Sequence, residues 1–216
     1  MTFAEMKAET FRRLRESSSA PIYFTEAEIE TALNDGYAEL SDATEWYENH
    51  LDIDLLNNRP YYDLRAVVGD TFLAIGPAFD VQTNRWLEST PVRILDAHDR
   101  RWERVTGEPH RLLTRGLWWL GYWPRIQSQT GVITQYYKGL PPPLVEDDDE
   151  PGFPEAFHEG CIEFAEADLW AQDAESDRAL AAWAAYVETE AGLLAWVDGR
   201  TSSAAIHGVG VQSVPR

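Results

Sequence analysis

A proline-rich and acidic break in the last third of the chain limits its fold more than any other feature. It lies within residues 136–170, YYKGLPPPLVEDDDEPGFPEAFHEGCIEFAEADLW. Three consecutive prolines at 141–143 interrupt regular structure, and five consecutive acids at 146–150 favour a solvated linker. Pro151 and Pro154 then precede a helical pattern, whose first turn tolerates proline. The sequence therefore predicts a β-rich middle and a helical C-terminal part, separated by a defined joint.

Charge and composition exclude several classes of protein. The 216 residues are 44% hydrophobic, which is enough for a buried core. Acidic residues outnumber basic ones 37 to 18, which gives a net charge of -19. This charge argues against direct binding of nucleic acid, but its repulsion of a polyanion suits a surface along which DNA moves. No apolar run reaches the roughly 18 to 20 residues of a membrane span, so we expect a soluble, unsecreted protein. The single cysteine, Cys161, excludes an intrachain disulfide and a Cys-based zinc site.

Two local signals predict a helical hairpin over residues 1–50. Thr2 with Glu5, and Thr25 with Glu28, have the spacing of capping boxes. Apolar residues at helical spacing follow each pair, and the second set continues to the end of this range. We therefore expect a short first helix and a longer second one.

The middle of the chain, residues 61–137, predicts a β-rich insertion. β-Branched and aromatic residues come in short runs separated by Gly, Pro, Asn and Asp, which is typical of strands. The expected strands are residues 61–64, 72–75, 79–82, 85–88, 93–95, 111–114, 117–123 and 132–137. The last two are expected to pair as a hairpin.

The C-terminal part predicts a pair of helices over residues 154–198, with a break near 173–177. In the second helix Leu180, Trp183 and Val187 repeat at helical spacing, so Trp183 is predicted to lie in the core. The fold class is therefore α+β: a helical bundle, made of the N-terminal hairpin and two C-terminal helices, with a β-rich middle insertion. We expect one domain over residues 1–200.

An extended tail over residues 201–216 is expected to need a partner. It is interrupted by glycine and has too few apolar residues to build a core. Four of these are the candidate partner-binding residues of the tail: Ile206, Val209, Val211 and Val214.

The aromatic cluster near residues 118–123 adds two further candidates. In a strand Trp118, Leu120 and Tyr122 face one side, while Trp119, Gly121 and Trp123 face the other. One set is expected in the core, which leaves Trp119 and Trp123 as candidates for subunit contact. A carbohydrate-stacking platform is the alternative, although no cluster of polar residues accompanies the rings.

No pattern in the sequence predicts an enzyme, a cofactor site or a metal site. The five histidines are scattered, and neither a nucleophile elbow nor a Gly-rich phosphate loop is present. Residues 147–149 offer three aspartates, but they lack the spacing of a calcium loop and are interpreted as solvated linker. His158 and Cys161 lie one helical turn apart, and we interpret Cys161 as a buried apolar residue rather than a nucleophile.

Taken in order, these segments resemble the head-to-tail adaptor family (connector or head completion proteins) of tailed bacteriophages. The resemblance covers about Thr25 to Trp196. It begins with EAEIETALNDGYAEL, continues with YYDLRAVVGD, NRWLESTPVRILDAHDRRWERVTGEPHRLLTRG and LWWLGYWP, and ends with the proline-rich and acidic segment described above. These are packing and turn residues, so their order and spacing carry the resemblance.

The resemblance implies a structural protein of the virion, located in the neck between capsid and tail and assembled in the host cytoplasm. It implies a ring of neighbouring adaptor subunits, commonly a dodecamer, under the portal protein. The ring would hold the next neck, stopper or tail protein and extend the channel through which genomic DNA passes without sequence-specific binding. The resemblance implies no membrane partner.

Two other functions compete with this expectation. The first is a monomeric binding module that uses the aromatic strand to bind a glycan or a host protein. The second is a hydrolase that uses a pair of carboxylates, although no pair stands out from the surface acids.

Overall fold

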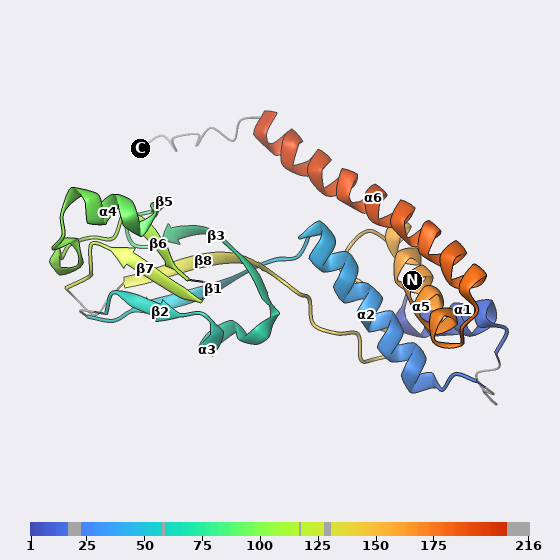
Figure 1. Cartoon of the computed structure of the whole chain (residues 1–216). Helices are drawn as coiled ribbons and strands as arrows, with labels where there is room; N and C mark the ends of the chain where they lie inside the picture. Colours follow the sequence, from blue (N-terminus) through green and yellow to red (C-terminus); the bar gives the residue numbers. More distant parts are fainter. Residues whose placement is uncertain (17–22, 58, 117, 128–130, 207–216) are drawn as a thin grey trace. The chain divides into compact units, whose positions relative to one another are not determined.

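Two compact units make up the chain (Figure 1). The computed structural model describes residues 1–16, 23–57, 59–116, 118–127 and 131–206. Met1–Trp46 with Pro141–Arg216 form the helical unit, and Tyr47–Leu140 form the β-rich unit. The predicted α+β class, a helical bundle with a β-rich middle insertion, is confirmed. The single domain expected for residues 1–200 stays a prediction. None of the described helices is both long and apolar enough to cross a membrane.

The helical unit contains four helices and a short 3-10 turn among its described residues. Both predicted capping boxes form, because the hydroxyls of Thr2 and Thr25 accept hydrogen bonds from the backbone N–H of Glu5 and Glu28. These caps satisfy backbone donors that a helix start otherwise leaves unpaired. The elements are α1 (Phe3–Leu14), α2 (Glu26–Thr44), η3 (Glu155–Phe157), α5 (Glu159–Gln172) and α6 (Ser176–Ile206).

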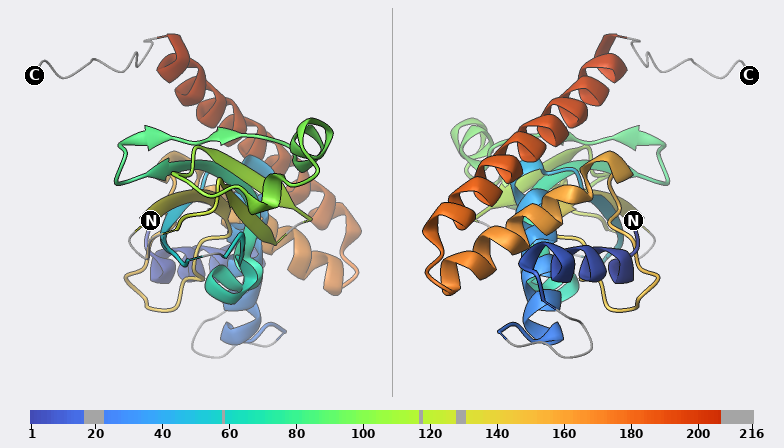
Figure 2. Two further views of the ribbon diagram at one scale, coloured as in Figure 1. Left: turned by 90° about the vertical axis from the view of Figure 1, so that its left-hand side faces the viewer. Right: turned by 90° about the vertical axis from the view of Figure 1, so that its right-hand side faces the viewer.

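The helix α5 lies at the centre of the helical unit, in contact with α1, α2 and α6 (Figures 1 and 2). The crossing of α2 and α5 is close at Gly36. A Cβ at this position would lie 2.9 Å from the Phe164 Cβ and 3.0 Å from the Cys161 carbonyl oxygen. The core around this crossing is mainly apolar and includes Phe3, Met6, Ile29, Leu33, Leu40, Cys161, Ile162, Ala165, Leu169, Tyr186 and Leu193.

The predicted end of the second helix is wrong. α2 ends at Thr44, because Glu45 adopts a left-handed backbone conformation with φ 48°. Trp46 then turns back, where its Nε1 donates to the Ser41 Oγ at 2.9 Å and its ring lies 5.6 Å from that of Phe153. The residues after this turn begin the first strand.

The predicted end of the last helix is also wrong. α6 continues to Ile206, past the expected end near residue 198, so residues 201–206 of the expected extended tail are helical. No proline interrupts this stretch, and Gly199 alone lowers its helix propensity by only about 1 kcal/mol. Val209, Val211 and Val214 lie outside the described residues.

The β-rich unit consists of two four-stranded sheets. Sheet A has the order β1 (Glu48–Leu55), β8 (Gly131–Gly139), β3 (Phe72–Asp80), β4 (Arg85–Trp86). Sheet B has the order β2 (Tyr61–Asp63), β7 (Trp119–Trp123), β6 (Arg111–Arg115), β5 (Glu88–Ser89). The remaining elements are α3 (Arg65–Val68), η1 (Gly69–Thr71), α4 (Val92–His98) and η2 (Trp102–Arg104).

The two sheets share one core between their inner faces. Both sheets contribute side chains to it, including Ile53, Leu55, Ala78 and Ile133 from sheet A and Tyr62, Leu112, Leu120 and Tyr122 from sheet B. A hydrogen bond from the Tyr122 hydroxyl to the Gln135 Oε1, at 3.3 Å, also joins the sheets. On the outer face of sheet B, Leu95 and Trp102 pack against Leu113. The outer face of sheet A is not covered in this way by the described elements of its unit.

Four features of the strands differ from the prediction. Residues 93–95 belong to the helix α4, where Leu95 is its buried residue. The strands β7 and β8 do not form a hairpin, because β7 pairs with β2 and β6 whereas β8 pairs with β1 and β3. The strand β1 was not predicted at all. Residues 72–75 and 79–82, expected as two strands, are largely one bulged strand, β3.

Candidate functional site

The last helix, α6, has apolar residues on two of its faces. One face is buried in the helical core and carries Ala182, Tyr186 and Leu193, with exposed fractions of 8%, 1% and 0%. The other face carries four large apolar residues that remain exposed: Leu180 (65%), Trp183 (45%), Val187 (46%) and Leu194 (41%). We call these four residues the α6 stripe. Single exposed apolar residues are normal, but a row of four on one helix face is typical of a surface that binds a partner.

The prediction that Trp183 is a core residue is wrong. Its ring rests on the edge of the helical core, 5.0 Å from the ring of Tyr186 and 6.1 Å from that of Phe164, and its remaining surface is open. The buried position on this helix is that of Tyr186, one turn later. The helix turns the face with Ala182, Tyr186 and Leu193 toward the helical core, and this leaves the α6 stripe on the outside.

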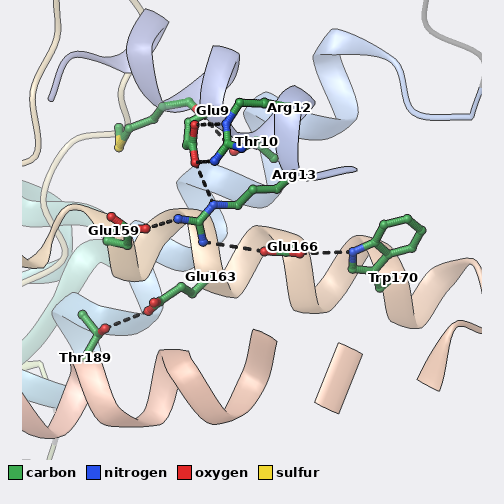
Figure 3. Close-up of polar contacts among 10 residues, drawn as sticks. Glu9, Thr10, Arg12, Arg13, Glu159, Glu163, Glu166, Trp170 and Thr189 are labelled. Carbon is green, nitrogen blue, oxygen red and sulfur yellow. Dashed lines mark hydrogen bonds and ion pairs between the residues drawn. The ribbon is translucent and has the colours of Figure 1, made fainter. Parts of the chain in front are cut away.

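Contacts with α5 hold α6, and with it the α6 stripe, in place. The Thr189 Oγ1 donates a hydrogen bond of 2.7 Å to the Glu163 Oε2, as Figure 3 shows. Next to it, a Cβ at Gly160 would lie 2.9 Å from the Thr189 methyl group, so the two helices approach closely here. The rings of Phe164 and Tyr186 pack edge to face at 5.3 Å. The stripe therefore lies on a supported helix rather than on a loop.

A network of charged groups fixes α1 to α5 (Figure 3). The guanidinium of Arg13 donates to Glu9 at 3.0 Å, to Glu159, and lies 3.7 Å from Glu166. Arg12 also donates to Glu9, at 2.7 Å. Hydrogen bonds from Arg12 and then Arg13 lower the pKa of the Glu9 carboxyl to about 2. Both arginines therefore compensate acids of their own chain.

The acidic linker is anchored to the helical unit, which the sequence did not predict. The Lys7 Nζ lies 2.9 Å from Asp147, 3.2 Å from Glu26 and 2.8 Å from Glu30. Burial alone would lower the pKa of Lys7, but these bonds, the one to Glu30 first, raise it above its ordinary value. The Asp149 carboxylate accepts hydrogen bonds from the backbone of residues 145 and 146 at 2.7 and 2.8 Å, which lowers its pKa.

The residues considered for catalysis or metal binding lie in structural positions. His158 is buried, with its Nε2 2.9 Å from the Phe153 carbonyl oxygen and its Nδ1 3.1 Å from that of Met1. Cys161 is fully buried, and this burial raises the pKa of its thiol to about 12, so it is no nucleophile at neutral pH. Within the described ranges, no group of three or more His, Cys, Asp or Glu is arranged to hold a metal ion.

The candidate aromatic residues of β7 lie on the outer face of sheet B. Trp119 is 44% exposed, while Leu120 and Tyr122 point into the core as the alternation predicted. Trp123 is half-buried, and its Nε1 donates to the Trp102 carbonyl oxygen at 2.8 Å. Their role in binding a partner stays a prediction. Of the tail candidates, Ile206 is the last residue of α6, and its side chain lies outside the described part of the structure.

The α6 stripe was missed as a binding surface, although the sequence contains a signal for it. Leu180, Val187 and Leu194 are spaced by seven residues, which is the repeat of a helix seam. The buried set with Tyr186 and Leu193 has the same spacing on another side of the helix. Two apolar repeats on one helix indicate one face for the core and one for a partner.

The net charge of the chain lies in the helical unit. This unit has 26 acidic and 7 basic residues, which account for the full -19, whereas the β-rich unit has 11 of each and is neutral. Such a concentration of one sign repels polyanions and also repels other copies of the same unit. Apolar or oppositely charged surfaces must offset that repulsion wherever copies meet.

A comparison of the chain with known protein families found a matching family. The family model described as SU10 adaptor protein matches residues 1–208, nearly the whole chain. No curated protein matches the chain.

Proposed function

The chain belongs to the SU10 adaptor protein family, a family of phage head-to-tail adaptors, and from this premise we propose that it forms a ring beneath the portal. The ring joins the capsid to the neck and tail and extends the channel for DNA. Its partners are the portal protein, the neighbouring copies, twelve in the complete ring, and the next neck, stopper or tail protein. The protein acts as structural material of the virion neck and catalyses no reaction.

The α6 stripe is the observation that carries this proposal. α6 has 31 residues, so it is about 46 Å long at 1.5 Å per residue. The stripe extends over Leu180 to Leu194 at seven-residue spacing, on a helix already held by its own core. A neighbouring helix that covers this face would bury the four side chains as knobs in a seam. We assign the stripe to the helical unit of the next copy in the ring.

The charge distribution supports the role of a DNA conduit. The acidic helical unit would line the channel, where its like charge keeps the phosphates from adhering to the wall. Arg12 and Arg13 do not contradict this, because both pair with Glu9. DNA then passes through the ring without sequence-specific binding.

A contact between the end of the chain and the portal is a further part of the proposal. Ile206, Val209, Val211 and Val214 supply apolar side chains for grooves of the portal or of a neighbouring copy. Deletion of residues 207–216 leaves α6 complete and removes three of the four side chains. The shortened chain is expected to bind the portal more weakly and to melt at nearly the same temperature.

Electron microscopy of the protein mixed with its portal tests the ring. The stripe variant Leu180→Gln, Leu194→Gln replaces two exposed side chains and is expected to keep the fold but to lose the ring. A matched control is Glu188→Gln, which changes an exposed residue of the same helix that is not part of the stripe. Rings of unchanged yield from the stripe variant would contradict the assignment of this surface. No ring or portal complex from the wild-type chain would contradict the proposed function itself.

A further inference from the structure

The two sheets of the β-rich unit present chemically opposite outer faces. Because their inner faces share one core, the outer face of sheet A and that of sheet B point away from each other. The unit as a whole is neutral, with 11 acidic and 11 basic residues. Its charges are nevertheless separated, acids on the first strand of sheet A and arginines on and around sheet B.

The outer face of sheet A is acidic and aromatic. Alternate residues of β1 point outward and are exposed: Glu48, His50, Asp52 and Asp54. Beside them a row of rings crosses the sheet, with Tyr136 5.7 Å from both His50 and Trp86, and Trp86 5.1 Å from Phe79. Trp86 is 56% exposed. We call these residues the acidic face; the side chain of Lys138, opposite Glu48, is the cation at its border.

The outer face of sheet B is basic and aromatic. On β6, Arg111 and Arg115 lie opposite Trp123 and Trp119 of β7. The Arg111 guanidinium lies 5.4 Å from the Trp123 ring centre, and that of Arg115 lies 5.6 Å from the ring centre of Tyr61. Stacking of this kind holds guanidinium groups in place while their edges stay available for hydrogen bonds.

Further arginines lie in the segments that pack against this surface. Residues 93–125, which include α4, η2, β6 and β7, contain seven arginines and four acids in a chain whose net charge is -19. Two of the four acids bind within the segment: Asp96 accepts from the Trp102 Nε1 at 2.7 Å, and Asp99 from the backbone N–H of Arg101 at 2.8 Å. We call Arg101, Arg111, Arg115, Trp119 and Trp123 the basic face.

One donor on the basic face lacks an acceptor. The Arg111 Nε is buried and makes no hydrogen bond with the described residues. The nearest carboxylate, that of Glu88, lies 3.9 Å away, which is too far for a hydrogen bond. The Nε itself is closed to an incoming group, but the Arg111 side chain is 30% exposed, so its outer guanidinium nitrogens can donate to a carboxylate of a partner. The acidic face offers three such carboxylates, on Glu48, Asp52 and Asp54.

We propose that the β-rich units of neighbouring copies bind head to tail, with the acidic face of one copy on the basic face of the next. The inference deepens the proposed ring, because it rests on copies lying side by side and names a second surface through which they meet. Opposite faces of one unit that complement each other produce a heterologous contact, which closes into a ring when its rotation allows. Aromatic side chains on both faces supply buried area, and the charges select the partner and its orientation.

Charge reversal on each face separately tests this contact. The acidic-face variant is Asp52→Lys, Asp54→Lys, and the basic-face variant is Arg101→Glu, Arg115→Glu. All four side chains are exposed, so both variants are expected to fold. A matched control, Asp148→Lys with Glu150→Lys, makes the same charge change as the acidic-face variant at exposed positions of the linker. Self-association of each full-length chain is measured by sedimentation velocity at low and at raised salt.

Each reversed variant alone is expected to self-associate at least about tenfold more weakly than the wild type, because like charges then face each other. An equimolar mixture of the two variants is expected to regain association, since the reversed face of each complements the unchanged face of the other. The control is expected to associate no more weakly than the wild type. Raised salt is expected to weaken both the wild-type contact and that of the mixture.

Three results would overturn the inference: reversed variants that associate as the wild type does, a mixture that fails to regain association, or a wild-type chain that stays monomeric at low salt. If the basic-face variant loses only binding to duplex DNA, this face serves phosphates and the inference also fails. The ring with the portal is scored separately by microscopy. If the reversed variants still form rings with the portal, the head-to-tail contact is contradicted and the proposed function stands. If the mixture regains self-association but no chain forms a complex with the portal, the head-to-tail contact stands and the proposed function is contradicted.

Discussion

Replacement of Gly36 by alanine tests the close crossing of α2 and α5, on which the helical unit depends. The added Cβ would lie 2.9 Å from the Phe164 Cβ and 3.0 Å from the Cys161 carbonyl oxygen. Neither atom is the mobile end of a side chain, so the two helices must move apart. Overpacking of this kind costs about 1–3 kcal/mol in a well-packed core.

The same substitution also favours the helix, and this gain must be removed from the comparison. Alanine is about 1 kcal/mol better than glycine inside a helix. Gly199 provides the matched control, because it lies within α6 and a Cβ there meets no atom within 4 Å. The difference between Gly36→Ala and Gly199→Ala therefore isolates the steric cost, and we expect the first variant to be less stable than the second by about 1–3 kcal/mol.

The measurement is the free energy of unfolding from urea titration of the wild type and the two variants, with unchanged slopes as the condition for comparison. Gly199→Ala is expected to be as stable as the wild type or more stable by up to about 1 kcal/mol. If the two variants agree within about 0.5 kcal/mol, helix α5 does not approach α2 as closely as the structure shows, and the account of this core is refuted.

Three further predictions concern the helical unit. Tyr186→Ala is expected to cost about 3–5 kcal/mol in urea titration and Trp183→Ala about 1–2, because the first ring is fully buried and the second is 45% exposed; equal losses would contradict the two-faced helix. The pKa of Glu9 is lowered from 4.5 to about 2, so its bonds stabilise the fold above pH 4.5 and are lost as the pH falls toward 2. Glu9→Gln should reduce stability by about 1–2 kcal/mol at pH 7 and by little near pH 2, and a pH-independent loss would exclude the ionised carboxylate as the cause. Lys7→Met is expected to cost about 1–2 kcal/mol, because it removes the three ion pairs of a mostly buried cation. Asp147→Asn removes one of the three and is expected to lower the melting temperature less; an equal loss would contradict a role shared with Glu26 and Glu30.

The helix starts could be predicted from the sequence because their signals are local. A capping box needs only two residues three positions apart, and those at Thr2 and Thr25 form as expected. The end of α2 could not be predicted in this way. It depends on a left-handed Glu45 and on Trp46 packing against Phe153, which is more than a hundred residues away in the sequence. The end of α2 therefore depends on long-range packing, which local periodicity in the sequence does not show.

The strand pairing shows the same limit. β7 and β8 follow each other in the chain, which made a hairpin the natural expectation. They lie instead in different sheets, and their inner residues, such as Ile133 of β8 and Tyr122 of β7, face each other across the core that the two sheets share. The helix α4 is short, and its residues 92–95, VRIL, have strand propensity; the contact of Leu95 with Trp102 outweighs it.

For the candidate site, apolar periodicity indicated that α6 has a face to bury but could not say against what. Core residues and interface residues obey the same spacing, since both are removed from water by a neighbour. Trp183 and Val187 are therefore indistinguishable in the sequence from Tyr186 and Leu193 as candidates for the core. The structure separates them by showing which face α5 covers.

The segregation of charge between the units constrains how copies can assemble. Neighbouring helical units of net charge -19 repel each other, so the α6 stripe must overcome this repulsion by burial of apolar surface, and added salt strengthens that contact by screening. The β-rich unit is neutral and its opposed faces attract, so added salt weakens the contact there. The two surfaces thus respond to salt in opposite directions. Self-association that weakens as salt is added therefore indicates the contact between the β-rich units, whereas a ring held by the α6 stripe alone gains stability with salt throughout.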